Sequence, residues 1–509
     1  MSGWRGWPVL LGLVMMPAPV VAGPAPEALF GKIDRIYADF ARDNHIPGLI
    51  YGVVAAGELV HVKGIGVQDI ATGAPVTQDS VFRIASLTKA FTALAALHLR
   101  DEGRLRLDDP VSRYIPELRV IPPQGVEARE IGIADLLDHT AGFVTDDPWG
   151  DRQLAMSEDE FSAAIARGVP MARAPGQFDY SNYGYTLLGR AIARASGQSY
   201  QHYIGGTLLD PLGMAATGWE VADIPKTVRV TGYRWEGGRN RPEPVLGDGA
   251  FGAMAGLHSS ARDYARYVVW LLSAWSDPGT QKEGARTEGP VLAASTVREA
   301  GTGAAYVRTQ VQTGADGQPC ASASMYGYGF YVVQDCRGRA MLRHAGGLPG
   351  YGSQVLLMPD RGIGIFAFAN LTYAAVYKPT LAAADLLAAS DMGGRKPPPP
   401  SADALAAVRA AMAIYRAGDY GGRKGLFADN LLLDHGLDVR NAALGDVRRR
   451  LGACGEPEQV EAPHALAARL RARCEQGMLG VSILLAPTIP ATIQYLEYEA
   501  LPPEEGTGQ

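Results

Sequence analysis

The 509-residue chain has no block rich in lysine and arginine, and its net charge of -6 is small for its length. Proteins that bind nucleic acid usually carry such a block, or a pI well above the value near 5.9 found here. Nucleic acid is therefore not an expected partner. With 47% hydrophobic and 20% charged residues, the composition is typical of a globular protein long enough to form two or more domains.

The chain has only four cysteines and nine scattered histidines. The histidines lack the close His/Cys spacing of a zinc site. We expect neither a metal nor a cofactor. The cysteines fall into two local pairs, Cys320 with Cys336 and Cys454 with Cys474, which favours disulfides formed in an oxidising compartment. Other connectivities, and free buried thiols, also fit the sequence.

The N-terminal region lacks an apolar run long enough to span a bilayer, because the stretch from Val9 to Met16 is short and is followed by prolines. Arg5 before it and Val20-Val21-Ala22 after it predict a signal peptide over residues 1–22. No cysteine follows the cleavage site, which argues against a lipoprotein anchor. We expect a periplasmic or secreted protein without a stable membrane anchor.

The first motif that carries chemistry is Ser86-Leu87-Thr88-Lys89, which opens a run of strong helix formers ending at Leu97. At this spacing the serine and the lysine share one helix face. A serine hydroxyl needs a base beside it, and a lysine serves once its environment makes it neutral. Alone, the motif is also typical of an ordinary helix start with a solvated lysine.

The second motif, Tyr180-Ser181-Asn182, lies between Pro175-Gly176 and a helical run that begins at Tyr183. This order predicts a loop that enters a helix. A nearby lysine ammonium can lower the pKa of a tyrosine enough for proton exchange, and an asparagine amide can orient the lysine and bind a substrate carbonyl. A core tyrosine followed by a helix cap is the alternative.

The third motif, His344-Ala345-Gly346-Gly347, ends a strand-like stretch that begins at Ala340. Two glycines would let a substrate approach the backbone closely. Such a strand edge can supply one oxyanion-hole N–H, with the backbone N–H of Ser86 as the other. A simple hairpin turn would explain the glycines but not the histidine. Together the three motifs predict a serine site that forms an acyl-enzyme.

These motifs resemble those of the class C serine β-lactamases and their penicillin-binding, peptidase and esterase relatives. Related enzymes carry Ser-x-x-Lys, Ser-Asp-Asn and Lys-Thr-Gly in this order, and the Tyr-x-Asn and His-x-Gly forms occur among class C-like relatives. The resemblance covers about residues 28 to 390. Five further segments carry it: Leu136–Gly142, Pro211–Met214, Ala255–Ser260, Tyr326–Phe330 and Gly347–Tyr351.

The resemblance implies that Ser86 is the nucleophile and that Lys89 and Tyr180 share the work of general base and acid. It leaves open which of the two takes the proton during acylation. The residues that it implies for substrate positioning and oxyanion binding are Asn182, His344, Gly346 and Gly347. His139, within the first of the five segments, is interpreted as tying a loop near the site.

His344 and Ala345 stand where β-lactam-hydrolysing relatives usually carry a lysine and a hydroxyl residue. Histidine is mostly neutral at pH 7 and alanine has no hydroxyl, so about 2 to 4 kcal/mol of carboxylate recognition is missing. Arg343 is adjacent, but on a strand its side chain points to the opposite face. We predict an esterase, amidase or D-amino-acid peptidase that takes a small-molecule or peptide substrate.

Two alternatives stay open: a β-lactamase or DD-carboxypeptidase, and a non-catalytic, penicillin-binding-like sensor or binding protein.

The order of predicted elements indicates an α+β fold. The predicted elements are a helix at 28–43, strands at 49–55 and 59–66, a mostly helical middle from residue 86 to about 275, strands at 326–334, 340–345, 352–358 and 363–369, and a helix at about 379–390. This order predicts an antiparallel sheet flanked by the first and last helices, with a helical subdomain inserted between its strands. The resemblance implies the same β-lactamase/transpeptidase-like architecture for residues 23–390.

A glycine- and proline-rich segment, residues 391–402, predicts a linker. The module after it, residues 403–509, is predicted as a small α+β domain. Its expected elements are helices at 404–415, 439–451 and 464–474 and two strands around Pro487. It has no nucleophile-and-base constellation, so we interpret it as structural or substrate-shaping. The sequence does not indicate an oligomeric state.

Overall fold

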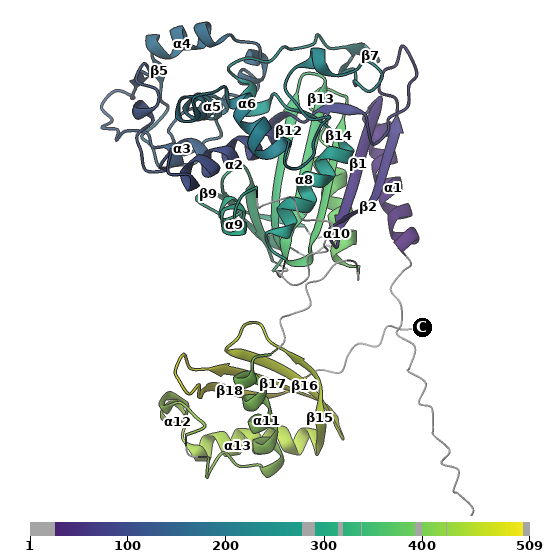
Figure 1. Cartoon of the computed structure of the whole chain (residues 1–509). Helices are drawn as coiled ribbons and strands as arrows, with labels where there is room; N and C mark the ends of the chain where they lie inside the picture. The colour runs from purple at the N-terminus through teal and green to yellow at the C-terminus, as the bar shows by residue number, and fades with distance from the viewer. Residues whose placement is uncertain are drawn as a thin grey trace, which may run out of the picture. The chain divides into compact units, whose positions relative to one another are not determined.

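The computed structural model describes residues 26–276, 291–313, 319–336, 338–390, 392, 400–423 and 425–501. The chain divides into two compact units between Gly394 and Arg395 (Figure 1). The predicted signal peptide and most of the predicted linker lie outside the described residues.

The first unit is built on one antiparallel sheet, which among the described residues has eight strands in the order β2-β1-β14-β13-β12-β11-β10-β9. Their bounds are β1 (Gly48–Ala55), β2 (Glu58–Gly66), β9 (Ala305–Thr313), β10 (Pro319–Tyr326), β11 (Tyr331–Asp335), β12 (Ala340–Leu348), β13 (Tyr351–Met358) and β14 (Ile363–Ala369). Strands β1 and β14 are buried along their whole length, as expected for strands covered on both faces.

Helices cover both faces of this sheet (Figure 1). They are α1 (Pro26–Asp43), α8 (Ala261–Ser273) and α10 (Tyr377–Ala388). On one face α1 meets α10, where the Tyr37 hydroxyl lies 2.8 Å from Thr380 Oγ1. On the other face Tyr264 of α8 packs against the ring of Phe366 in β14. The predicted sheet flanked by the first and last helices is confirmed.

The polypeptide between β2 and β9 contains the inserted helical subdomain. Its further elements are β3 (Val81–Arg83), α2 (Thr88–Asp101), β4 (Val120–Ile121), α3 (Ile133–Leu137), α4 (Glu158–Arg167), β5 (Val169–Pro170), α5 (Asn182–Ser196), α6 (Tyr200–Ile204), β6 (Tyr233–Glu236), β7 (Arg239–Pro242), α7 (Gly252–Ala255), β8 (His258–Ser260) and α9 (Ala294–Ala300). Helix α2 is buried over most of its length, because its segment from Ala90 to Leu97 is apolar except for Thr92. Ser353 of β13 donates a hydrogen bond of 2.6 Å to the Ile84 carbonyl just before α2, which joins the subdomain to the sheet.

The strand predictions were incomplete at one edge of the sheet. The sequence did not predict β9, and the strand expected at 326–334 is the end of β10, a turn and β11. Most described residues of β9 and the first residues of β10 are partly or fully exposed, and the apolar residues of β9, such as Tyr306 and Val311, do not alternate regularly with polar ones. An edge strand of this kind lacks the apolar alternation on which strand prediction depends.

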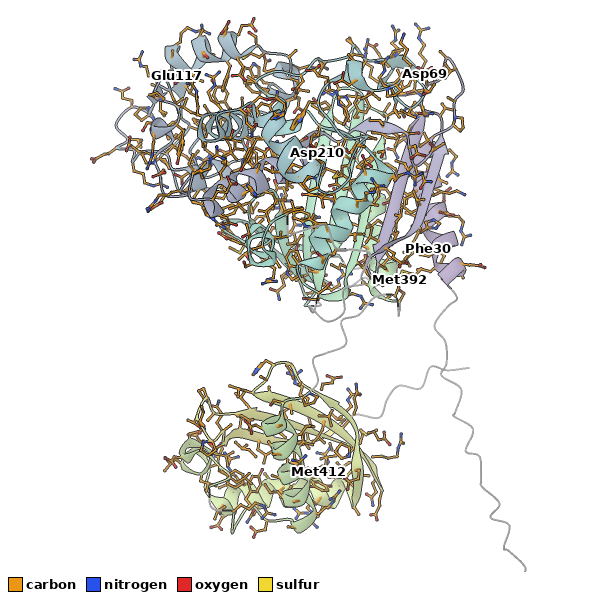
Figure 2. All side chains as sticks on the ribbon, in the orientation of Figure 1. Phe30, Asp69, Glu117, Asp210, Met392 and Met412 are labelled. Carbon is orange, nitrogen blue, oxygen red and sulfur yellow. A yellow bond between two sulfur atoms is a disulfide. The ribbon has the colours of Figure 1, made fainter. Side chains whose placement is uncertain are left out.

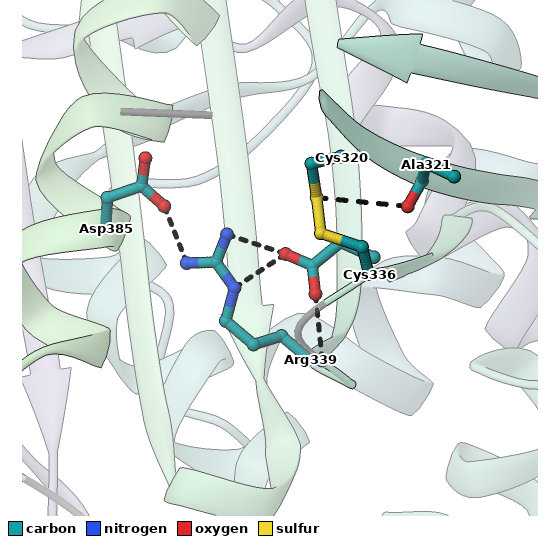
Figure 3. Close-up of a disulfide and its surroundings, with 6 residues drawn as sticks. Cys320, Ala321, Cys336, Arg339 and Asp385 are labelled. Carbon is teal, nitrogen blue, oxygen red and sulfur yellow. Dashed lines mark hydrogen bonds and ion pairs between the residues drawn. A yellow bond between two sulfur atoms is a disulfide. The ribbon is translucent and has the colours of Figure 1, made fainter. Parts of the chain in front are cut away.

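The predicted Cys320–Cys336 disulfide is present and joins β10 to the residue after β11 (Figure 3). Beyond the following turn, the Arg339 guanidinium donates a hydrogen bond of 2.6 Å to Asp385 of α10. The hairpin is therefore tied both to itself and to the helix layer.

The second unit is a small α+β domain with a four-stranded antiparallel sheet among its described residues, in the order β15-β16-β17-β18. Its elements are α11 (Ala402–Ala417), α12 (Asp429–Asp434), α13 (Leu437–Leu451), β15 (Cys454–Glu461), β16 (Ala467–Cys474), β17 (Gly477–Leu485) and β18 (Ile493–Leu501). Met412 of α11, labelled in Figure 2, belongs to its apolar core. The predicted Cys454–Cys474 disulfide joins β15 to β16.

The helix expected at 464–474 is wrong, since most of this segment forms β16. Alanine, leucine and arginine favour helices, but Leu470 and Ala472 point inward while the arginines between and beside them are exposed. Pairing with β15 and β17 outweighs the local helix preference.

Among the described residues, no helix is both long and apolar enough to cross a membrane.

Candidate active site

A cavity of about 640 Å³ opens beside Ser86, between the inserted subdomain and β12. Its lining residues are Ser86, Thr145, Asp147, Pro148, Asp151, Tyr180, Tyr331, His344, Ala345, Gly346, Gly347, Ser353, Tyr373, Ala374, Ala375 and Tyr377. Five predicted site residues are in this set, and the other two, Lys89 and Asn182, lie fully buried next to it. We call Ser86, Lys89, Tyr180 and Asn182 the floor of the cavity.

Ser86 follows a residue with unusual backbone geometry. Ala85 has a φ of 50°, in the left-handed region that costs a non-glycine residue about 1 kcal/mol or more. The Thr88 hydroxyl donates a hydrogen bond of 2.7 Å to the Ala85 carbonyl, which holds this turn. The turn places Ser86 two residues before the first residue of α2, near the helix end where the dipole favours developing negative charge.

Lys89 lies one helical turn after Ser86 and is inaccessible to solvent. Its Nζ donates hydrogen bonds to Ser86 Oγ at 3.2 Å, to Asn182 Oδ1 at 2.7 Å and to the Met254 carbonyl at 3.0 Å. Burial lowers the pKa of Lys89 to about 8, against the opposing charges of nearby aspartates. A fraction of this amine is therefore neutral near pH 7 and can accept a proton.

Tyr180 lines the cavity together with Ser86, and its ring centroid lies 4.9 Å from Lys89 Nζ. The expectation that Lys89 lowers the pKa of Tyr180 is wrong, because burial and the charge of Asp147 raise this pKa well above its ordinary value. Tyr180 therefore carries its proton in the resting site.

His139 holds the loop that carries Tyr180. Its Nδ1 accepts a hydrogen bond of 3.1 Å from the Ser181 N–H, and its carbonyl accepts one of 2.9 Å from the Asp179 N–H. The centroids of the His139 and Tyr180 rings are 4.4 Å apart. This geometry agrees with the interpretation that the histidine ties a loop near the site.

Asn182 links Lys89 to an acidic loop that the sequence did not single out. Its Oδ1 accepts from Lys89, as predicted, while its Nδ2 donates to Asp147 Oδ1. The carboxylate of Asp146 accepts the backbone N–H groups of Asn182 and Tyr183 at 2.7 and 2.8 Å. Asp146 thus caps the start of α5, and Asp147 fixes the orientation of the Asn182 amide.

We call Asp147, Asp151, His344, Ala345 and Tyr373 the wall of the cavity. The His344 ring in this wall is neutral. Its Nδ1 lies 2.6 Å from the Ala345 carbonyl, so this nitrogen carries the proton, and its Nε2 accepts from the Tyr326 hydroxyl at 3.0 Å. Burial, with a contribution from Lys89, lowers the pKa of His344 to about 3. The ring is therefore not a cation that holds a substrate carboxylate.

The two glycines of the third motif are explained by neighbouring protein atoms. A Cβ on Gly346 would lie 2.2 Å from Ser353 Oγ and 2.7 Å from the Ile84 carbonyl oxygen. A Cβ on Gly347 would lie 2.7 Å from the Tyr373 ring. Strand β12 therefore passes close to the segment before Ser86. This contact brings the first and third motifs to one cavity.

Sequence reasoning missed Asp147, Asp151 and Tyr373. The Tyr373 hydroxyl donates a hydrogen bond of 3.0 Å to Asp151, whose pKa burial and the charge of Asp147 raise to about 7. The only local signal is Asp147-Pro148, which predicts a turn but not the cavity it lines. Within the described part of the chain, no group of histidine, cysteine and carboxylate side chains could hold a metal ion.

Comparison with known proteins identifies the family. A sequence model of the Beta-lactamase family matches residues 33–390. Protein flp of Staphylococcus aureus (strain COL) is 29% identical over 346 residues, 67% of this chain and 63% of that protein. Beta-lactamase-like protein 2 of Dictyostelium discoideum is 27% identical over 373 residues, 72% of this chain and 63% of that protein. The matches thus span less than two thirds of either relative.

The structure of the octameric penicillin-binding protein homologue from Pyrococcus abyssi is similar with a TM-score of 0.58 at 21% identity. The likeness covers 90% of this chain and 91% of that chain, and it shows the shared fold. The family match supports a serine hydrolase-type function in general. The resemblance seen in the motifs is confirmed, and the chain belongs to the β-lactamase family.

Proposed function

We propose that this protein is a serine hydrolase that forms an acyl-enzyme on Ser86 and acts on esters, amides or D-amino-acid peptides. One observation carries the proposal: Ser86 Oγ lies 3.2 Å from the Nζ of Lys89, a buried amine whose pKa is lowered to about 8. At pH 7 about a tenth of this amine is neutral and able to take the serine proton.

The first step forms the acyl-enzyme. Ser86 Oγ attacks the substrate carbonyl carbon and its proton moves to Lys89 Nζ, while the backbone N–H groups of Ser86 and Gly347 stabilise the oxyanion. The carbonyl carbon then loses its alcohol or amine. Tyr180, which holds its proton at rest, donates it to this leaving group and is reprotonated from Lys89.

The second step releases the product. Water attacks the acyl carbonyl and gives a proton to neutral Lys89, the ester bond to Ser86 breaks, and the serine regains its proton. This assignment makes Lys89 the base and Tyr180 the acid, because of these two residues only the lysine has a pKa near neutral pH.

A β-lactamase or DD-carboxypeptidase is the second candidate, since the family includes β-lactamases. The neutral His344 and the missing hydroxyl at Ala345 weaken recognition of a substrate carboxylate. A non-catalytic binding protein is the third candidate, but it gains little from a buried lysine held against a serine.

We also propose that the protein works in the periplasm or outside the cell. Its two disulfides are compatible with an oxidising compartment. The predicted signal peptide supports the same location.

Hydrolysis of p-nitrophenyl butyrate by the purified protein, beside its Ser86→Ala variant, tests the proposal. We expect turnover by the unaltered protein and loss of at least 10²-fold in kcat/KM in the variant. Equal turnover by both proteins would refute it. Turnover of nitrocefin far above that of simple esters would favour the β-lactamase candidate instead.

A further inference from the structure

The cavity beside Ser86 is acidic. Two carboxyl groups, Asp147 and Asp151, line it, and among the described lining residues there is no arginine or lysine. Asp147 is exposed, whereas Asp151 is 3% exposed and accepts from Tyr373. The ammonium of Lys89 lies beneath the surface and already donates to three oxygens. It is not available as a partner for a substrate anion.

Aromatic rings surround the same space. Tyr180, Tyr331, Tyr373 and Tyr377 all line the cavity. The face of an aromatic ring attracts a cation, because the π electrons make it negative. Tyr373 combines both features, because its hydroxyl bonds to Asp151 while its ring lies against Gly347, the predicted oxyanion donor. A carboxyl group and an aromatic ring therefore stand together beside the expected position of the scissile carbonyl.

The same cavity offers little to bind a negatively charged substrate group. His344 uses both ring nitrogens for Ala345 and Tyr326 and is neutral. Asn182 donates its amide to Asp147. An incoming carboxylate would be repelled by the charge of Asp147, and by Asp151 whenever that group is ionised, and no arginine or lysine among the described lining residues could bind it. An ammonium would instead find carboxyl oxygens with unused lone pairs.

We propose, on the basis of the hydrolase function above, that the protein selects substrates with a primary ammonium group on the acyl part, close to the carbonyl attacked by Ser86. Asp147 and Asp151 bind this ammonium, and the Tyr373 ring covers it. The substrate class is thus esters or amides of small amino acids with a free amino group.

Three benzyl esters that differ in one substituent test this inference. They are alanine benzyl ester (as D and L forms), benzyl 2-methylpropanoate and the monobenzyl ester of methylmalonic acid, which place an ammonium, a methyl or a carboxylate on the same carbon. We expect kcat/KM for the better alanine enantiomer to exceed that of the neutral ester by at least tenfold, and the anionic ester to be slowest. A neutral ester as fast as the cationic one would overturn the inference.

The Asp147→Asn and Asp151→Asn variants locate the selectivity. Asparagine retains an acceptor for Asn182 or Tyr373 but removes the charge. We expect each variant to reduce the cationic-to-neutral ratio of kcat/KM by about tenfold. Because the ratio compares two substrates on one preparation, a general loss of activity cancels. An unchanged ratio in both variants would overturn the assignment.

The outcomes separate this inference from the proposed function. If Ser86-dependent hydrolysis of the neutral ester occurs without preference for the cation, the hydrolase proposal stands and the inference fails. If no ester is hydrolysed, or if Ser86→Ala hydrolyses them equally, both fail.

Discussion

The floor and the wall of the cavity differ in how their side chains are held. On the floor, Lys89 joins Ser86 to Asn182 through direct hydrogen bonds, and the buried amine has no contact with solvent. On the wall, Asp147 is exposed, and Tyr373 is partly exposed on a loop after β14.

The floor therefore resembles a rigid catalytic centre. In the wall, His344 and Asp151 are also buried, whereas Asp147 and Tyr373 reach solvent and can be replaced without opening the core. Every floor residue lies in a motif that the family resemblance covers, whereas His344-Ala345 departs from the usual lysine and hydroxyl. We infer that the floor sets the reaction and the wall sets the substrate. The predictions below test this separation.

The largest effect is expected at Lys89. Replacing it by methionine removes the proton acceptor of Ser86, so kcat/KM for p-nitrophenyl butyrate should fall by about 10²–10⁴-fold. Steady-state assays with the purified variant measure kcat/KM, and a thermal unfolding curve checks that the variant is folded. A folded Lys89→Met protein with full activity would show that the lysine is not the base.

Tyr180→Phe tests the other floor group that exchanges protons. Since Tyr180 is assigned to the leaving group, the loss should be larger for a poor leaving group, such as an alkyl ester, than for p-nitrophenol. Comparing the two losses in kcat/KM measures this. Equal losses would contradict the assignment of Tyr180 as the acid.

His139 should have an intermediate effect as a positioning residue. His139→Leu leaves the buried Ser181 N–H without an acceptor, which costs about 1–3 kcal/mol and should lower kcat by about tenfold through a displaced Tyr180. His139→Asn restores an acceptor oxygen and tolerates the φ of 63° at this position, so it should recover part of both losses. No difference between the two variants would mean that the bond to Ser181 is unimportant.

The charge of Asp151 in the wall should have a smaller effect on Lys89 in the floor, which the pH dependence of kcat/KM reveals. Below its pKa of about 8 Lys89 is protonated and cannot act as a base, so kcat/KM should rise with pH through this value. The charge of Asp151 raises the pKa of Lys89, so Asp151→Asn should shift the rise to lower pH, by roughly half a unit. Asp159→Asn, at an exposed position of α4, is the matched control and should leave the profile in place. A shift to higher pH would contradict the electrostatic account.

Alanine substitutions at the two glycines of β12 should lower the free energy of unfolding by modestly different amounts. The Cβ of Gly346→Ala would meet the backbone oxygen of Ile84, which cannot move freely, so we expect a loss of about 1–3 kcal/mol in the free energy of unfolding. The Cβ of Gly347→Ala would meet the ring of Tyr373, a residue that is 41% exposed and able to shift, so the loss should be smaller. Denaturant unfolding of both variants measures the difference. Equal losses would contradict this account of the strand.

The sequence predicted the floor because its residues come in short motifs. Ser86 and Lys89 are one helical turn apart, and Tyr180 and Asn182 flank a helix start, so local spacing carries the information. The acidic wall could not be predicted in this way. Asp151 and Tyr373 are far apart in the chain and meet only after the sheet and the subdomain have folded together.

The same contrast holds for the fold. The sheet strands β1, β13 and β14 are apolar and were predicted, whereas the exposed edge strand β9 and the arginine-rich β16 were not. In β16 tertiary pairing decides the structure against the local helix preference. The pKa of Tyr180 is a further case, because burial outweighs the nearby lysine that the motif indicates.

The most direct test of the central claim is to trap the acyl-enzyme. The protein is mixed with p-nitrophenyl butyrate, quenched in acid within the first turnovers and digested, and the peptides are analysed by mass spectrometry. The account predicts a butyryl group on Ser86, absent from Ser86→Ala. Hydrolysis that continues in Ser86→Ala, with the butyryl group on another residue or on none, would contradict it.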